Sequence, residues 1–234
     1  MLVYVLSALA AVVGLAGGPS LWRRSRFWSL GLLAGGLAAA AYAGGMAGSA
    51  IAFKVYYALG ASMFPGLIGT GSLYAIFSGR LARWPAAFVV LLSFLQLGLT
   101  LPASVNGLAL SGLDGGNGAG VLVLGPWVIA TVLFNTFGLG FALVAALYGW
   151  WKAFRQPALS HAALAVGLSV VVLGVLARSD GVYQLLVRAG GGSAFLLLDA
   201  AAFALVWLGA SMVRRLPLPL ERLLAGGVRQ SSAA

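Results

Sequence analysis

The chain has 234 residues, of which 62% are hydrophobic and 8% are charged, and its 14 Lys and Arg against 4 Asp and Glu give a formal net charge of +10. A soluble domain carries roughly 25% charged residues, so this composition excludes a soluble globular protein. The sequence contains no cysteine, which excludes disulfide scaffolds, thiol enzymes and iron–sulfur or Cys-ligated zinc proteins. The single histidine, His161, cannot supply a multi-histidine metal site or a bis-histidine haem site.

Apolar stretches long enough to cross a bilayer recur along the whole chain. Runs of about 20 apolar residues predict seven spans, near residues 3–18, 28–48, 56–77, 86–105, 125–149, 159–177 and 194–213. These runs are continuous, whereas barrel strands alternate polar and apolar residues. We therefore expect an all-α, polytopic membrane bundle of seven transmembrane helices over residues 1–213, followed by a short basic tail at 214–234. No basic region precedes the first run, so we expect it to be retained as a span and not cleaved as a signal peptide.

The distribution of positive charge predicts an orientation. Most of the Lys and Arg residues flank one set of span ends: Arg23, Arg24, Arg26, Arg80, Arg83, Lys152, Arg155, Arg214, Arg215, Arg222 and Arg229. Because cytoplasmic loops are enriched in Lys and Arg, we expect the N-terminus outside and the C-terminus in the cytoplasm. The same residues predict contact with anionic lipid headgroups. Their scatter over several short segments argues against nucleic acid as a partner.

Small residues and proline predict how the helices pack. Glycine supplies 34 residues, and the second span carries the small-xxx-small steps Gly31/Gly35 and Gly44/Gly48. Such steps predict close packing inside the bundle, with homodimerisation as the alternative. Pro65 predicts a kink in the third span. Six tryptophans at the predicted span ends suggest an aromatic belt: Trp22, Trp28, Trp84, Trp127, Trp150 and Trp151.

Polar residues at membrane depth mark the candidate site, because each is costly there and faces a partner or a cavity. Asp199 is the only acid that the segmentation places inside a span. With the external loops, the outer halves of the spans provide the predicted ligand-binding residues Asp199, Asn135, Gln96, Thr100, Tyr57, Tyr56, Arg188 and Lys54. We expect an outward-facing polar cavity with Asp199 at its floor. The alternative is structural: Asp199 pairs with Arg188 and locks the bundle, and Asn135 only joins helices.

The segment 106–124 is the one long external connection, and its glycine-rich core, residues 114–120, is expected to be flexible turn material. The stretches YYALGASMFPGLIGTGSLYAIFSGRLAR at 56–83 and LFNTFGLGFALVAALYGWWKAFR at 133–155 resemble a group of uncharacterised bacterial seven-helix membrane proteins. That resemblance implies the bacterial inner membrane as the location and brings no assigned activity, so the cofactor stays unknown. The seventh span has no Lys and therefore lacks the Schiff-base residue of a retinal protein.

Three functions remain from the sequence. The first is a protein that binds or transports a small molecule or lipid-like ligand through the outer cavity. The second is a non-catalytic accessory subunit of a larger membrane complex, with a membrane protein partner or a second copy of the chain. The third is a membrane enzyme, which the composition disfavours because general acid–base work usually needs paired titratable groups and only Asp199 is deep enough to be tuned. No metal site and no catalytic residue is predicted.

Overall fold

A computed structural model describes residues 1–77, 80–113, 120–156, 159–176 and 194–212. The described part of the chain is helical, apart from connecting segments and one isolated bridge between Val105 and Leu122. Seven of its helices are long and apolar enough to cross a membrane. The prediction of an all-α chain with seven such helices is confirmed. The predicted tail, 214–234, lies outside the described residues.

The helices follow the predicted spans to within a few residues at most ends. They are α1 (Leu2–Leu21), α2 (Arg26–Met46), α3 (Ala50–Tyr56), η1 (Tyr57–Met63), α4 (Phe64–Ile76), α5 (Arg80–Thr100), α6 (Gly107–Ser111), α7 (Trp127–Arg155), α8 (Leu159–Leu176) and α10 (Ala194–Met212). The third span is made of α3, η1 and α4 in succession. Serine caps start two spans, because Ser25 accepts a hydrogen bond from the Trp28 amide and Ser49 accepts one from the Ala52 amide.

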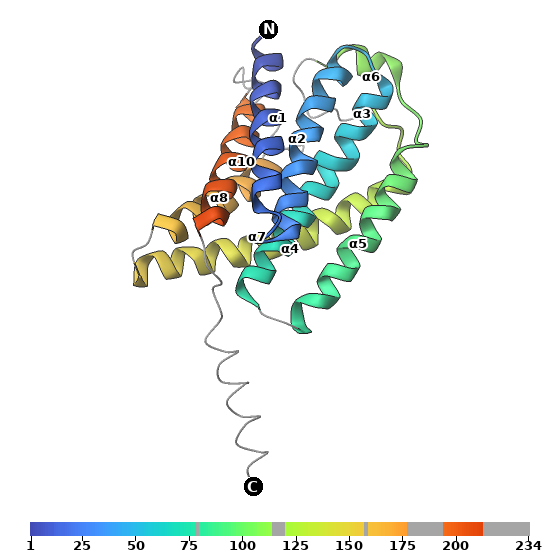
Figure 1. Cartoon of the computed structure of the whole chain (residues 1–234). Helices are drawn as coiled ribbons and strands as arrows, with labels where there is room; N and C mark the ends of the chain where they lie inside the picture. The colour runs from blue at the N-terminus through green and yellow to red at the C-terminus, as the bar shows by residue number, and fades with distance from the viewer. Residues whose placement is uncertain (78–79, 114–119, 157–158, 177–193, 213–234) are drawn as a thin grey trace.

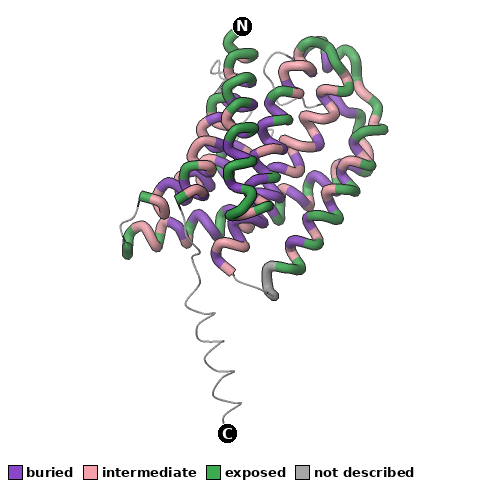
Figure 2. Tube along the Cα trace, in the orientation of Figure 1, coloured by how far each residue is buried: buried purple, intermediate pink, exposed green. Residues whose placement is uncertain are grey.

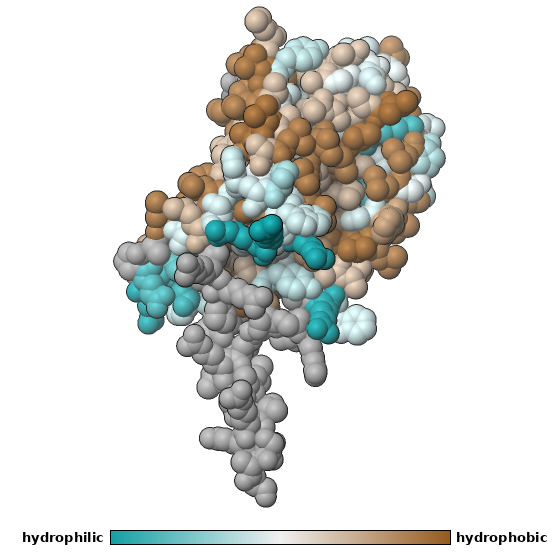
Figure 3. Space-filling model, viewed as in Figure 1, coloured by the Kyte–Doolittle hydropathy of each residue, from teal (hydrophilic) through white to brown (hydrophobic). Residues whose placement is uncertain are grey.

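The basic connections gather at one end of the bundle. The ends of α1, α4 and α7 and the starts of α2 and α5 point toward the lower end of Figure 1, opposite the N-terminus. Arg24 donates a hydrogen bond to the backbone carbonyl of Ser211 in the last turn of α10, which ties the α1–α2 connection to that end. Figure 3 shows hydrophilic residues near this end and a mainly apolar surface above them.

Helix α2 lies among the other helices. Of the seven spans it has the largest share of buried residues, 56%. Figure 2 colours the buried residues of the bundle interior purple. Gly31 and Gly35 are buried, and an added Cβ would meet Ile68 at the first and Phe203 at the second. The predicted internal packing of this part of α2 is therefore observed. Gly48 differs from that prediction: it is exposed, at φ +88° after the end of α2, so it serves a turn and not a helix contact.

The third span departs from α-helical geometry immediately before Pro65. Seven residues, Tyr57–Met63, form a π-helix, and α4 follows with Pro65 in its first turn. Proline has no N–H to donate to the preceding turn, and π-helical turns are rare interruptions that are frequent at functional sites. The sequence predicts a kink here, and what the structure shows at this point is a π-helix.

The described parts of the connection after α5 pack against the bundle. Asn106 accepts hydrogen bonds from the Leu108 and Ala109 amides and so starts the short helix α6. Leu110, Leu113 and Leu122 are buried in a cluster with residues of α2, α3, α7 and α10. This connection therefore packs against the end of the bundle opposite the basic connections. The core of the predicted turn, residues 114–119, lies outside the described residues.

The aromatic-belt interpretation holds for only some of the six tryptophans. Trp22, Trp84 and Trp151 are exposed by 48%, 83% and 43%. Trp28 and Trp127 are buried; the Trp28 indole donates to the Ser72 hydroxyl at 3.2 Å and the Trp127 indole donates to the Val123 carbonyl at 3.0 Å. A tryptophan at a span end can thus satisfy its N–H inside the bundle, which the sequence position does not distinguish from a belt position.

Candidate functional site

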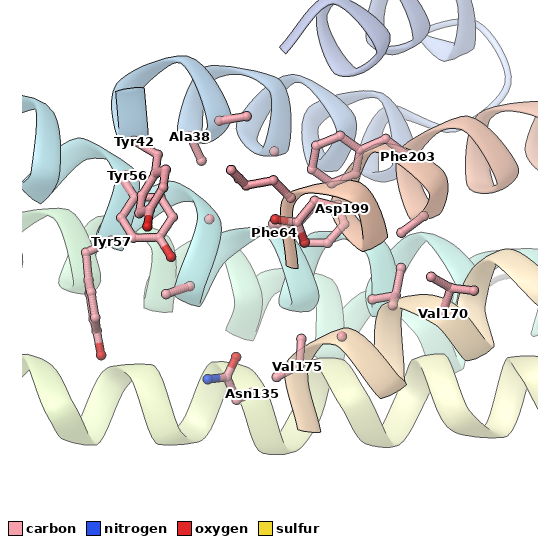
Figure 4. Close-up of a pocket in the computed structure, with 18 of the residues that line it drawn as sticks. Ala38, Tyr42, Tyr56, Tyr57, Phe64, Asn135, Val170, Val175, Asp199 and Phe203 are labelled. Carbon is pink, nitrogen blue, oxygen red and sulfur yellow. The ribbon is translucent and has the colours of Figure 1, made fainter. Parts of the chain in front are cut away.

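A cavity of about 420 Å³ lies between five of the membrane-length segments. Its walls come from α2, from η1 with the flanking residues of α3 and α4, and from α7, α8 and α10 (Figure 4). Small and aliphatic residues make up most of the lining. The aromatic and polar part consists of Tyr42, Tyr56, Tyr57, Phe64, Phe203, Thr131, Asn135 and Asp199. Such a volume is typical of small-molecule sites, which are mostly apolar with a few placed polar groups.

The cavity lies toward the end of the bundle opposite the basic connections. Tyr42 is near the C-terminal end of α2, and Asp199 is in the second turn of α10. Tyr56 and Tyr57 lie within the first third of the span that starts at Ala50. Each of these helix ends is the one away from Arg23, Arg83 and Arg155.

Four of the eight predicted site residues line this cavity: Tyr56, Tyr57, Asn135 and Asp199. Figure 4 draws Asp199 and Asn135 among the lining residues, with the Asn135 side chain rising from α7. The Asn135 Oδ1 atom is buried and has no hydrogen-bond partner among the described residues. Thr136, its neighbour in sequence, is exposed on the outside of the bundle. Helix α7 therefore points the amide inward and the hydroxyl of the next residue outward.

Gln96 and Thr100 lie outside the cavity lining and form a buried network behind it. Both side chains are fully buried. The Gln96 Nε2 atom is 3.0 Å from the Ser62 hydroxyl, 2.9 Å from that of Thr100 and 3.0 Å from that of Thr131. The Ser62 and Thr131 hydroxyls are 3.0 Å apart. This network joins α5, η1 and α7, and Thr131 carries it to the cavity wall.

The two predicted basic residues are placed differently. The Lys54 Nζ atom donates a hydrogen bond of 2.8 Å to the Leu101 carbonyl, so this lysine closes the end of α5 and does not line the cavity. A cation at exposed carbonyls of a helix C-terminus is favourable. Arg188 lies outside the described residues, and with it the predicted pair between Arg188 and Asp199.

Aromatic residues form more of the site than the sequence indicated. The Tyr42 and Tyr56 ring centroids are 4.7 Å apart, and those of Phe64 and Phe203 are 4.9 Å apart in an edge-to-face pair. Tyr42, Phe64 and Phe203 were not among the predicted site residues. A signal exists for one of them, since Tyr42 is a large side chain in a helix otherwise rich in Gly and Ala.

Among the lining residues that the structure describes, Asp199 is acidic and none is Lys, Arg or His. No group of three or more His, Cys, Asp and Glu that could hold a metal ion occurs among the described residues. The lining therefore offers a carboxyl group, an unpartnered amide oxygen, phenols and ring faces. Comparisons with protein-family models, with curated proteins and with solved structures return no significant match for this chain.

Proposed function

We propose that this chain is a multi-pass protein of the bacterial inner membrane that binds or transports a small molecule or lipid-like ligand through the cavity described above. The observation that carries the proposal is a cavity of about 420 Å³ within the spans that contains an acid, an amide and phenols. Polar groups at membrane depth are costly and usually mark a pathway or a binding site. The basic connections at the other end favour a cytoplasmic position for that end, so the cavity faces outward.

The same orientation supports a second part of the proposal. Arg23, Arg24, Arg26, Arg83 and Arg155 are exposed at the end that we assign to the cytoplasm. Exposed basic side chains next to a membrane attract anionic lipid headgroups. We therefore expect anionic lipid to be enriched around this end, separately from any ligand in the cavity.

The proposal is tested by filling the cavity. Val175 lines it, whereas Leu173, on the same helix, is 61% exposed on the outside of the bundle. The full chain is purified from its native membranes in mild detergent, and native mass spectrometry records bound non-protein mass. Val175→Trp should reduce the occupancy of a copurifying ligand about tenfold or more, because the indole takes its volume, and the control Leu173→Trp should retain it.

Equal occupancy in both variants would show that the bound molecule lies elsewhere. A chain that carries no ligand in any membrane preparation, and that copurifies with a second membrane protein in fixed ratio, would favour the accessory-subunit function instead.

A further inference from the structure

We infer that the ligand of the cavity is a single-chain amphiphile, held with its polar head toward the outer end of the bundle and its apolar chain in a closed inner end. The outer end is the end opposite the basic connections. This inference rests on the proposed function and names its ligand class. It follows from the order of polar and apolar lining residues along the spans.

The polar side chains of the lining lie in the outer part of the cavity. On each span that provides one, it lies nearer to the outer end than the deepest lining residue does. Asp199, for example, is one turn outward of Phe203 on α10, and Asn135 is one turn outward of Leu139 on α7. Figure 4 shows Tyr42, Tyr56 and Tyr57 toward one end of the cavity and Val170 and Phe203 toward the other. The polar lining residues are Tyr42, Tyr56, Tyr57, Thr131, Asn135 and Asp199.

The inner end of the cavity is apolar and closed. The deepest lining residues of the five spans are Gly35, Phe64, Leu139, Val170 and Phe203. About one turn deeper lies a second apolar layer, in which each residue is exposed by 0% and belongs to one core cluster: Leu32, Ile68, Ala142, Leu168 and Val206. The Phe64 and Phe203 rings pack edge to face, with centroids 4.9 Å apart. The cavity therefore ends near the middle of the spans.

This order determines how an amphiphile lies in the cavity. A polar head without a hydrogen-bond partner is costly in apolar surroundings, so the head avoids the inner end and the apolar chain occupies it. In the outer part, the Asn135 Oδ1 atom is buried and has no partner among the described residues, although buried acceptors normally have one. The last side-chain torsion of Asn is soft. The carboxamide can therefore turn to accept a hydrogen bond from a ligand hydroxyl.

The dimensions of the cavity suit one chain. Its volume of about 420 Å³ lies in the lower part of the range for small-molecule sites, roughly 300–1,000 Å³. Thr131 and Leu139 line its outer and inner parts on α7, and their separation along the helix is about 12 Å. Each acyl chain of a phospholipid fills about half of the ~30 Å hydrocarbon core, so such a lipid is longer than the cavity is deep.

The test uses two photoreactive forms of 1-decanol, one with a diazirine at the last carbon and one with a diazirine beside the hydroxyl. The full chain in nanodiscs is irradiated with each probe, and mass spectrometry of peptides locates the labelled residues. Excess unlabelled decanol should suppress both labels. We expect the tail diazirine to label inner residues such as Phe64, Leu139 and Phe203, and the head diazirine to label Tyr56, Tyr57 or Thr131.

A matched pair of variants tests the closed inner end. Leu139 lines the cavity, whereas Leu143, one turn further along α7, is 47% exposed on the outside of the bundle. Leu139→Trp should reduce the labelling by the tail probe about tenfold or more, because the indole takes the space of the chain. The control Leu143→Trp should retain it.

The comparison of the two probes needs no variant, so it stands even if Leu139→Trp does not fold. Labelling in the reverse order, or labelling of the same residues by both probes, would overturn the inferred orientation. Absence of labelling that excess decanol suppresses would overturn the ligand class. None of these outcomes decides the proposed function, which the copurification experiment tests with whatever molecule the cavity holds.

Discussion

Gln96 shows how one polar residue at membrane depth can serve packing. Its amide nitrogen reaches three hydroxyls on three segments, while its Oε1 atom has no partner among the described residues. Ser62 and Thr131 also donate to backbone carbonyls of their own helices. Gln96 therefore supplies the contact that crosses between α5 and the other two segments. Because no hydrophobic effect drives helices together in lipid, polar contacts of this kind contribute to holding them, alongside close packing.

Gln96→Leu should destabilise the bundle by about 1–2 kcal/mol, because an apolar side chain cannot donate to the hydroxyls of η1 and α7. The free energy of unfolding is measured by titration with a denaturing detergent. Ser93→Ala is the matched control on the same helix, since Ser93 bonds only to the Val89 carbonyl of α5 among the contacts described. Equal stability of Gln96→Leu and the parent chain would contradict the structural role.

The sequence identified polar residues inside the spans but not which of them share a cavity. Gln96 and Asn135 looked alike, as amides at similar depth, yet one lies in a packing network and the other lines the cavity. The difference depends on how each helix is rotated about its own axis. Helices without a strong amphipathic pattern give no sequence signal for that rotation, since both lipid and core favour apolar side chains.

At the scale of single elements, α4 and α7 contact each other through their backbones. A Cβ added at Gly69 would overlap the Gly138 carbonyl, and one added at Gly138 would overlap the Pro65 carbonyl. Small residues let helices approach this closely in a membrane. The contact fixes α4 directly after the π-helical turn, so it holds the cavity wall that η1 provides.

Gly138→Ala should destabilise the chain by about 1–3 kcal/mol, because the methyl group forces α4 away from α7. Gly140 is the control: it lies on the same helix, is exposed, and an added Cβ would meet nothing within 4 Å. Gly140→Ala should be neutral or stabilise by about 0.5–1 kcal/mol through helix propensity. Thermal unfolding of the two variants in the same detergent separates them, and equal melting temperatures would contradict the backbone contact.

At the scale of the whole molecule, the seven spans were predictable because continuous apolar runs of this length have few other solutions. The π-helix was not, since Pro65 indicates an interrupted helix but not the form that the interruption takes. The buried connection with α6 was also missed. Its Gly-rich composition resembles a loop, but Leu110, Leu113 and Leu122 reach the core of the bundle end.

The orientation can be tested in this cysteine-free chain. Leu108 is 87% exposed in the α5–α7 connection, and Gln156 is exposed at the end of α7. With an impermeant thiol reagent on intact cells, Leu108→Cys should be labelled and Gln156→Cys should be labelled only after the membrane is opened. Labelling in the reverse order would invert the orientation and place the cavity on the cytoplasmic side.

The glycine contacts also determine which parts of the bundle can move. Gly14 lies against Gly36 between α1 and α2, Gly69 against Gly138 between α4 and α7, and Gly167 against Val206 between α8 and α10. When packed helices slide past each other, their side chains adjust to absorb the movement. At the crossings of these three pairs, the backbones meet with almost no side chains between them. Each pair should therefore behave as one rigid body. Because the cavity takes walls from all three pairs, we expect that a movement which opens it changes the contacts between pairs and leaves those within each pair intact.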